Sequence, residues 1–180
     1  QMYVGNLNFE DKFRQTGTVK NDTIGAAVFV SAEELENKVG SELKSMSVYQ
    51  IGSTTPKYFK VFVTHEIEGE AIYEKEIDVT TIKEGWNTFE LDSSLLISGD
   101  SLYLGYYFSS SSAASFGVAN SSTIQSYIKK GATAEWSLTK GIAVYGTLVG
   151  NSLPGLDVVM TSDVETVDIE KDKIFSIPFM

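Results

Sequence analysis

Short runs rich in Val, Ile, Thr, Tyr and Phe recur along the chain, and Gly, Ser, Asn and Asp separate them. This spacing is typical of a β-sandwich or barrel, and the many aromatic residues suit half-buried strand surfaces. The sequence therefore predicts an all-β fold. The expected strands are Ala26–Val30, Lys44–Ile51, Tyr58–Ile67, Ile72–Val79, Asn87–Leu91, Ser101–Ser109, Ser115–Ala119, Gln125–Lys129 and Ile142–Val149.

Two of these runs indicate how the strands face the core. In Tyr58–Ile67 one face carries apolar residues together with His65, so we expect that face to be buried. The run Leu102–Phe108 is apolar on both faces, which predicts a central strand covered on each side.

One short helix is expected after Ser31. Ser31 and Glu34 have the spacing of a capping box, in which the Ser31 hydroxyl accepts from a backbone amide while Glu34 reaches back to the cap amide. Leu35 and Val39 form a small apolar stripe, and Gly40 is placed to end the helix in the left-handed conformation.

The 180 residues suffice for one domain, or for one domain and part of a second. A β-sandwich is expected over residues 1–150, and the Gly, Ser and Pro content of residues 151–155 is typical of a linker. Two further strands are expected within residues 156–180, but two strands cannot enclose a core. This last segment is predicted to be a partial second β domain, or a tail that pairs with the first domain or a neighbouring molecule.

Composition excludes several classes of function. The net charge of −10 repels nucleic-acid phosphates and anionic lipid headgroups. The chain has no Cys, which excludes disulfides and thiol nucleophiles. His65 is its one histidine, which excludes a metal site with several histidine ligands. No apolar run approaches the roughly 18 residues of a transmembrane helix, so membrane insertion is not expected. The N-terminus does not have the pattern of a signal peptide. Because the chain begins with Gln, the question of an export signal upstream is left open.

Several short motifs occur in a defined order. The strand Ala26–Val30 runs into the capped helix, Gly85-Trp86-Asn87 precedes Leu91, and Leu102-Tyr103-Leu104-Gly105-Tyr106 follows. Over roughly residues 20–150 this succession resembles the cleaved-adhesin-type modules of Bacteroidetes surface and secreted multidomain proteins. The resemblance implies a jelly-roll sandwich, similar to galactose-binding-like carbohydrate modules, that acts in adhesion rather than catalysis. The chain after Pro154 resembles the first strands of the Ig-like domains that often follow such modules.

The same resemblance bears on metal binding, because such modules often hold a structural calcium near the sandwich edge. The acidic, glycine-rich loop that some members use for it is not evident here, where the chain reads Asn8-Phe9-Glu10-Asp11-Lys12-Phe13. We therefore predict no cofactor, leave a structural calcium open and assign no metal ligands.

Aromatic side chains are the best candidates for a ligand site, because sugars stack their apolar C–H faces on Trp and Tyr. Trp136 lies in a polar stretch with Tyr127 nearby, and these two residues are the predicted ligand-binding pair. Trp86, directly after Gly85, is more typical of a packing residue. Tyr103 and Tyr107 share a face of a strand that is expected to be covered.

Enzymatic alternatives rest on few residues. His65 is predicted to be a structural histidine with one hydrogen bond, since a catalytic role needs a nucleophile and an orienting carboxylate. Glu74 and Glu76 share a strand face and provide the two carboxylates of a glycoside hydrolase. A charged, solvated strand face is the more common reason for such a pair.

The leading hypothesis is a non-catalytic, secreted or cell-surface module beside other domains of a larger bacterial protein. Its expected partner is a carbohydrate or a host or bacterial surface protein, and nucleic acid is not expected. The first alternative is a structural spacer without a ligand. An acid-dependent glycoside hydrolase is the second.

Overall fold

Strands dominate the structure and form two antiparallel sheets, which confirms the predicted all-β sandwich. The computed structural model describes residues 2–9, 12–17, 21–110 and 115–150. The strands are β1 (Met2–Gly5), β2 (Phe13–Gln15), β3 (Thr23–Val30), β4 (Glu42–Ile51), β5 (Tyr58–Thr64), β6 (Ala71–Glu76), β7 (Gly85–Leu96), β8 (Leu102–Ser109), β9 (Ser115–Ala119), β10 (Gln125–Lys130), β11 (Ser137–Lys140) and β12 (Val144–Val149).

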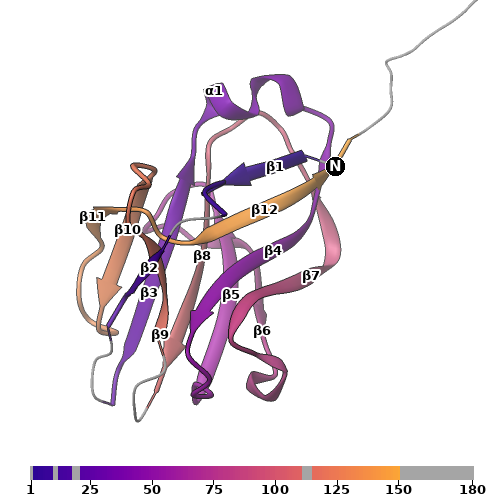
Figure 1. Ribbon diagram of the computed structural model, residues 1–180. Helices are drawn as coiled ribbons and strands as arrows, with labels where there is room; N and C mark the ends of the chain where they lie inside the picture. The colour runs from indigo at the N-terminus through magenta and orange to yellow at the C-terminus, as the bar shows by residue number, and fades with distance from the viewer. Residues whose placement is uncertain (1, 10–11, 18–20, 111–114, 151–180) are drawn as a thin grey trace, which may run out of the picture. The chain divides into compact units, whose positions relative to one another are not determined.

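We name the two layers sheet I and sheet II (Figure 1). Sheet I has the order β1-β12-β4-β9-β2, with β7 also paired to β4, and sheet II has the order β11-β10-β3-β8-β5-β6. Along the chain β1, β4, β7 and β12 belong to sheet I, while β3, β5, β6 and β8, which come between them, belong to sheet II. The resulting orders β1-β12-β4-β7 and β3-β8-β5-β6 are those of a jelly roll.

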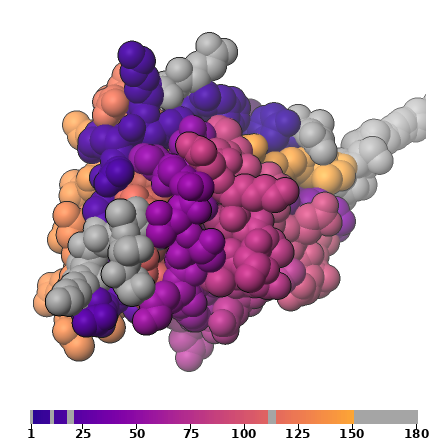
Figure 2. All heavy atoms as spheres, turned by 60° about the horizontal axis from the view of Figure 1, so that its bottom comes forward, coloured from indigo at the N-terminus to yellow at the C-terminus, as the bar shows by residue number. Residues whose placement is uncertain are grey.

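The remaining strands extend this arrangement. In the ribbon view β10 and β11 lie at one side of the molecule and β6 and β7 at the other (Figure 1). Figure 2, which looks at the molecule from its lower end, shows the same separation, with the orange β10–β11 region opposite the magenta β6–β7 region. The full width of sheet II therefore separates β11 from β6.

Each of the nine strands expected between Ala26 and Val149 is present, although several ends differ. Three strands were not expected, namely β1, β2 and β11, and each has only three or four residues. Such short runs are too brief for alternation to stand out in the sequence. The strand expected at Ile72–Val79 stops at Glu76, and Val79–Thr81 instead forms a 3₁₀ turn capped by Asp78.

His65 does not lie on a buried strand face, so that prediction was wrong. Strand β5 ends at Thr64, and His65 is exposed in the following turn. Its Nδ1 donates to the carbonyl oxygen of Ser101 over 3.2 Å, the single hydrogen bond that was expected. The strand backbone of β5 ends at Thr64, so His65 no longer follows the alternation of inward and outward side chains and its imidazole lies outside the core.

The helix begins as expected but is shorter. The Ser31 hydroxyl accepts from the Glu34 amide over 3.1 Å, and α1 (Ala32–Leu35) passes into a 3₁₀ turn at Glu36–Lys38. The Glu34 carboxylate accepts from the amide of Gly5 in β1 rather than from the cap amide. Val39 is 57% exposed, so the expected apolar stripe consists of buried Leu35 alone.

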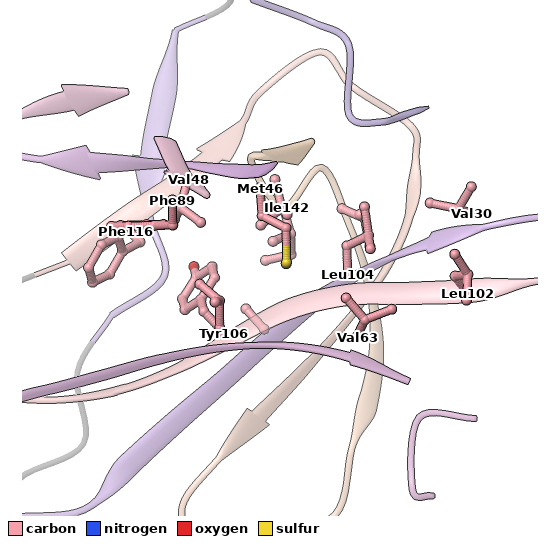
Figure 3. Packing of buried hydrophobic residues seen from close by; sticks show 14 of the residues in the cluster. Val30, Met46, Val48, Val63, Phe89, Leu102, Leu104, Tyr106, Phe116 and Ile142 are labelled. Carbon is pink, nitrogen blue, oxygen red and sulfur yellow. The ribbon is translucent and has the colours of Figure 1, made fainter. Parts of the chain in front are cut away.

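The core lies between the sheets. Leu104 and Tyr106 of β8 point toward Met46 and Val48 of β4, and Phe116 of β9 completes the group (Figure 3). The Tyr106 ring centroid lies 5.1 Å from that of Phe116. Burial between the layers raises the pKa of Tyr106 far above its ordinary value. The inner face of sheet II therefore packs in the core, and its outer face is available for other contacts.

The last described strand, β12, ends at Val149. The linker predicted at residues 151–155 and the partial β domain predicted at 156–180 lie outside the described residues and stay predictions. Within the described ranges, no helix has the length and apolar character needed to cross a membrane.

Candidate functional site

The outer face of sheet II carries the predicted residue Trp136, and its strand register explains which side chains surround it. Lys129 of β10 pairs with Gly25 of β3, Gly25 pairs with Tyr107 of β8, and Tyr107 pairs with Lys60 of β5. Directly paired residues of antiparallel strands point to the same face. This row therefore places a lysine at each end and a residue without a side chain near its middle.

Trp136, Tyr107 and Phe62 form what we call the aromatic platform. The ring centroid of Trp136 lies 5.9 Å from that of Tyr107 and 6.2 Å from that of Phe62. Phe62 and Tyr107 are 5.0 Å apart. Phe62 is buried beneath its neighbours, whereas Tyr107 and Trp136 remain partly exposed. The platform therefore has a packed base and two accessible rings.

Gly25 makes room for these two rings. A Cβ atom at this position would lie 2.8 Å from Trp136 Cη2 and 2.8 Å from Tyr107 Cε1, closer than carbon atoms pack. Its φ angle is ordinary, so its role here is space rather than backbone conformation. The close approach of Trp136 to the sheet depends on the absent side chain.

Two adjoining hollows flank the platform. The larger has a volume of about 520 Å³ and is lined by Lys60, Phe62 and Tyr107 among others. The smaller, of about 380 Å³, is lined by Trp136 and also by Tyr107. Lys129 lines both hollows. Volumes of this order are typical of sites for small molecules.

Asp22 anchors the turn that leads to Trp136. Its Oδ1 accepts from the amide of Ala132 over 2.9 Å and from the amide of Thr23 over 2.7 Å. The Ala134 amide closes the turn by donating to the carbonyl oxygen of Gly131 over 3.1 Å. The hydrogen bond from Ala132, followed by that from Thr23, lowers the pKa of Asp22. Asp22 is therefore a positioning residue for the segment that carries Trp136.

Lys60 and Glu74 provide charge at the far end of the larger hollow. The Lys60 ammonium lies 2.9 Å from the Glu74 carboxylate and 5.5 Å from the centre of the Tyr107 ring. The hydrogen bond to Glu74 is the main reason that the pKa of Lys60 is raised. Burial raises the pKa of Tyr107, so the phenol stays neutral beside this pair.

Tyr127, the second predicted residue, lies on the same outer face but not in the platform. Its ring is 5.5 Å from that of Tyr103, and its hydroxyl accepts from Gln125 Nε2 over 2.7 Å. Burial, with a smaller contribution from Tyr127, raises the pKa of Tyr103. Of the two predicted residues, Trp136 lines one of these two hollows and Tyr127 lines neither, although Tyr127 extends the aromatic surface beside them.

Sequence reasoning missed Tyr107, Phe62 and Lys129. Tyr107 was set aside because β8 was expected to be covered on both faces. Strand β8 is central, but Tyr103 and Tyr107 remain partly exposed on its outer face. An antiparallel sheet commonly packs one face on the core and leaves the other to solvent. The wide spacing of β5, β8 and β10 in the sequence hides the platform and its lysine.

A second group of rings, which we call the sheet I cluster, lies on the outer face of the other sheet. Trp86 contacts Phe9, Tyr49 and Tyr145 edge to face, at centroid distances between 5.0 and 6.0 Å. Phe13 stacks on Tyr49 at 4.1 Å and also contacts Trp86. A hollow of about 430 Å³ lies beside these rings. Trp86 lines this hollow as well, but four rings pack against it, as expected for a packing residue.

Neither a catalytic pair nor a metal site emerges from the residues placed in the structure. Glu74 is engaged by Lys60, and Glu76 is an exposed residue of the edge strand β6. In residues 2–9, 12–17, 21–110 and 115–150, no three His, Cys, Asp or Glu side chains gather closely enough to hold a metal ion.

Comparison with protein-family models, with curated proteins and with solved structures finds no match to this chain. The resemblance to cleaved-adhesin-type modules therefore stays a prediction, and the case for function rests on the geometry of the outer face of sheet II.

Proposed function

We propose that this chain is a non-catalytic module that binds carbohydrate on the outer face of sheet II. The observation that carries the proposal is the pair of partly exposed rings, Trp136 and Tyr107, beside two adjoining hollows. A sugar ring presents an apolar C–H face to such an aromatic surface and hydroxyl groups to the polar rim. Carbohydrate is thus the partner class that the platform fits best.

The surroundings of the platform supply the polar partners that a sugar needs. Lys129 and Glu135 line the smaller hollow, and Lys60, Glu74 and Tyr58 line the larger one. Charged and phenolic groups can donate to or accept from sugar hydroxyls. Tyr58 and Lys60 of β5, Glu74 of β6 and Lys129 of β10 stand on paired strands of sheet II, which fixes where these side chains begin relative to Tyr107 and Phe62.

A secreted or cell-surface location, and attachment to a larger bacterial protein, are part of the same proposal. Both rest on the resemblance of residues 20–150 to adhesion modules. A structural spacer without a ligand is the competing function, and a binding experiment separates the two.

The test is a glycan array, followed by affinity-gel electrophoresis on any hit, with the wild type and Trp136→Ala. We expect wild-type binding to be lost in Trp136→Ala, because the stacking surface is removed. Leu138→Ala is the matched control, since Leu138 is a 69% exposed apolar residue on β11 that lines neither hollow. Equal signals from wild type and Trp136→Ala, or no binding by the wild type, would favour the spacer.

A further inference from the structure

Lys129 differs from the other charged residues around the platform. It is partly buried, lines both hollows and stands across Gly25 from Tyr107. Within the described part of the chain, no residue forms a salt bridge or hydrogen bond with its side chain. Lys129 lines both hollows and its ammonium group has no protein partner among the described residues, so this group is available to a ligand.

The two hollows differ in charge. The larger contains Lys60, Lys129 and a single acid, Glu74, which Lys60 already holds at 2.9 Å. The smaller contains Lys129 with Glu68 and Glu135. The larger hollow thus has one net positive charge, contributed by Lys129, and the smaller has one net negative charge. A negative group on a ligand is expected on the side of Lys129 that faces the larger hollow.

The charge of the whole chain limits what kind of anion this is. A protein with a net charge of −10 repels a densely charged polyanion at long range. One ammonium group in a hollow that Tyr107 also lines still attracts a single carboxylate at short range, where salt screens less. The arrangement therefore favours a ligand in which an isolated carboxylate accompanies an apolar ring face.

From this geometry we propose that the ligand is an oligosaccharide containing a uronic acid, whose ring stacks on Trp136 and Tyr107 and whose carboxylate meets Lys129. The proposal rests on the proposed function, because the stacking surface is the same. It adds the class of sugar and the residue that selects it. Lys60, held by Glu74, borders the site as a donor to hydroxyl groups.

The experiment uses the intact chain and matched sugars. Disaccharides that each contain a single galacturonic, glucuronic or mannuronic acid are compared with their methyl esters, which keep the ring and remove the charge. Affinities are measured by isothermal titration calorimetry at low salt. We expect at least one acid to bind about tenfold more tightly than its ester, the effect of one charge-assisted hydrogen bond. Raising the salt concentration should shrink this difference.

Two lysine variants identify the selecting residue. Lys129→Gln should bind acid and ester equally, with ester binding retained. Lys130→Gln is the control, because Lys130 is exposed, adjoins Lys129 on β10 and points to the opposite side of the strand. It should keep the preference of the wild type.

The outcomes separate the two proposals. If no acid binds more tightly than its ester, or if Lys129→Gln keeps the preference, the uronic-acid inference is overturned. In that case, binding of neutral sugars that depends on Trp136 would still support the proposed carbohydrate function. If neither the acids, the esters nor neutral glycans bind, both proposals fail.

Discussion

The outer faces of the two sheets both carry clustered aromatic rings, but they use them differently. In the sheet I cluster, rings enclose Trp86, with Phe13 and Tyr49 stacked over Gly117. In the aromatic platform of sheet II, Trp136 and Tyr107 lie over Gly25 and border two hollows that contain a lysine without a protein partner.

The difference lies in what the rings contact. Rings packed edge to face against one another already satisfy their preferred geometry, and they contribute to stability. Trp86 also borders a hollow, but four of the described rings pack on it. Two described rings pack on Trp136, which keeps more of its surface for a ligand and borders a hollow that Lys129 also lines. A tryptophan on a sheet is therefore best judged by its neighbours. On this basis we expect Trp86 to serve stability and Trp136 to serve binding.

The largest expected effect is on stability at Trp86. Trp86→Ala should lower the free energy of unfolding by about 2 kcal/mol, less than for a fully buried ring because Trp86 is partly exposed. Chemical denaturation measures this change. Trp136→Ala should cost about 1 kcal/mol or less, since fewer rings pack on it. A larger loss at Trp136 than at Trp86 would reverse the assignment of the two faces.

A smaller loss of stability is expected at Gly25 and Gly117, the glycines beneath the aromatic platform and the sheet I cluster, which form a matched pair. A Cβ at Gly25 meets the ends of Trp136 and Tyr107, and a Cβ at Gly117 lies 2.9 Å from Phe13. Each Gly→Ala change should cost about 1 kcal/mol of stability through overpacking. Only Gly25→Ala should weaken glycan binding, by about tenfold for a displaced stacking ring. Equal binding by both variants would show that the position of Trp136 over the sheet is unimportant.

The smallest expected effect is at Asp22. Asp22→Asn should weaken binding several-fold by loosening the turn before Trp136. Overall stability should change little, because Asp22 is only half-buried and lies outside the core. The hydrogen bonds lower the pKa of Asp22, so its contribution is complete above the pKa of a free aspartate. It is lost as the pH falls through the lower pKa of the folded state. Titration calorimetry on both proteins checks the prediction, and unchanged affinity would contradict it.

The all-β class and most strands could be predicted because their runs are long and bounded by turn residues. Strand β11 could not, because Ser137–Lys140 has four residues and little apolar character. The end of β5 was misplaced because the alternation continues through His65 in the sequence, while the backbone turns after Thr64. Periodicity shows which residues can share a face, but not where pairing with the neighbouring strand stops.

The site was predictable only in part. Trp136 stands out as a large ring in a polar stretch, a signal that a single sequence contains. Its neighbours Tyr107 and Phe62 come from β8 and β5, and only the strand order of sheet II brings them together. The free charge of Lys129 is likewise a property of its surroundings. Side chains that converge from distant strands leave no local pattern.

The two tryptophans, one on each outer face, permit the most direct test of this division of roles. Trp86→Phe leaves Trp136 as the only indole, and Trp136→Phe leaves Trp86. Each variant is titrated with the disaccharides that contain one uronic acid, their methyl esters and neutral glycans while tryptophan fluorescence is recorded. Our account predicts a saturable change in the Trp86→Phe protein and none in the Trp136→Phe protein. A saturable change that appears only when Trp86 is the remaining indole would contradict it.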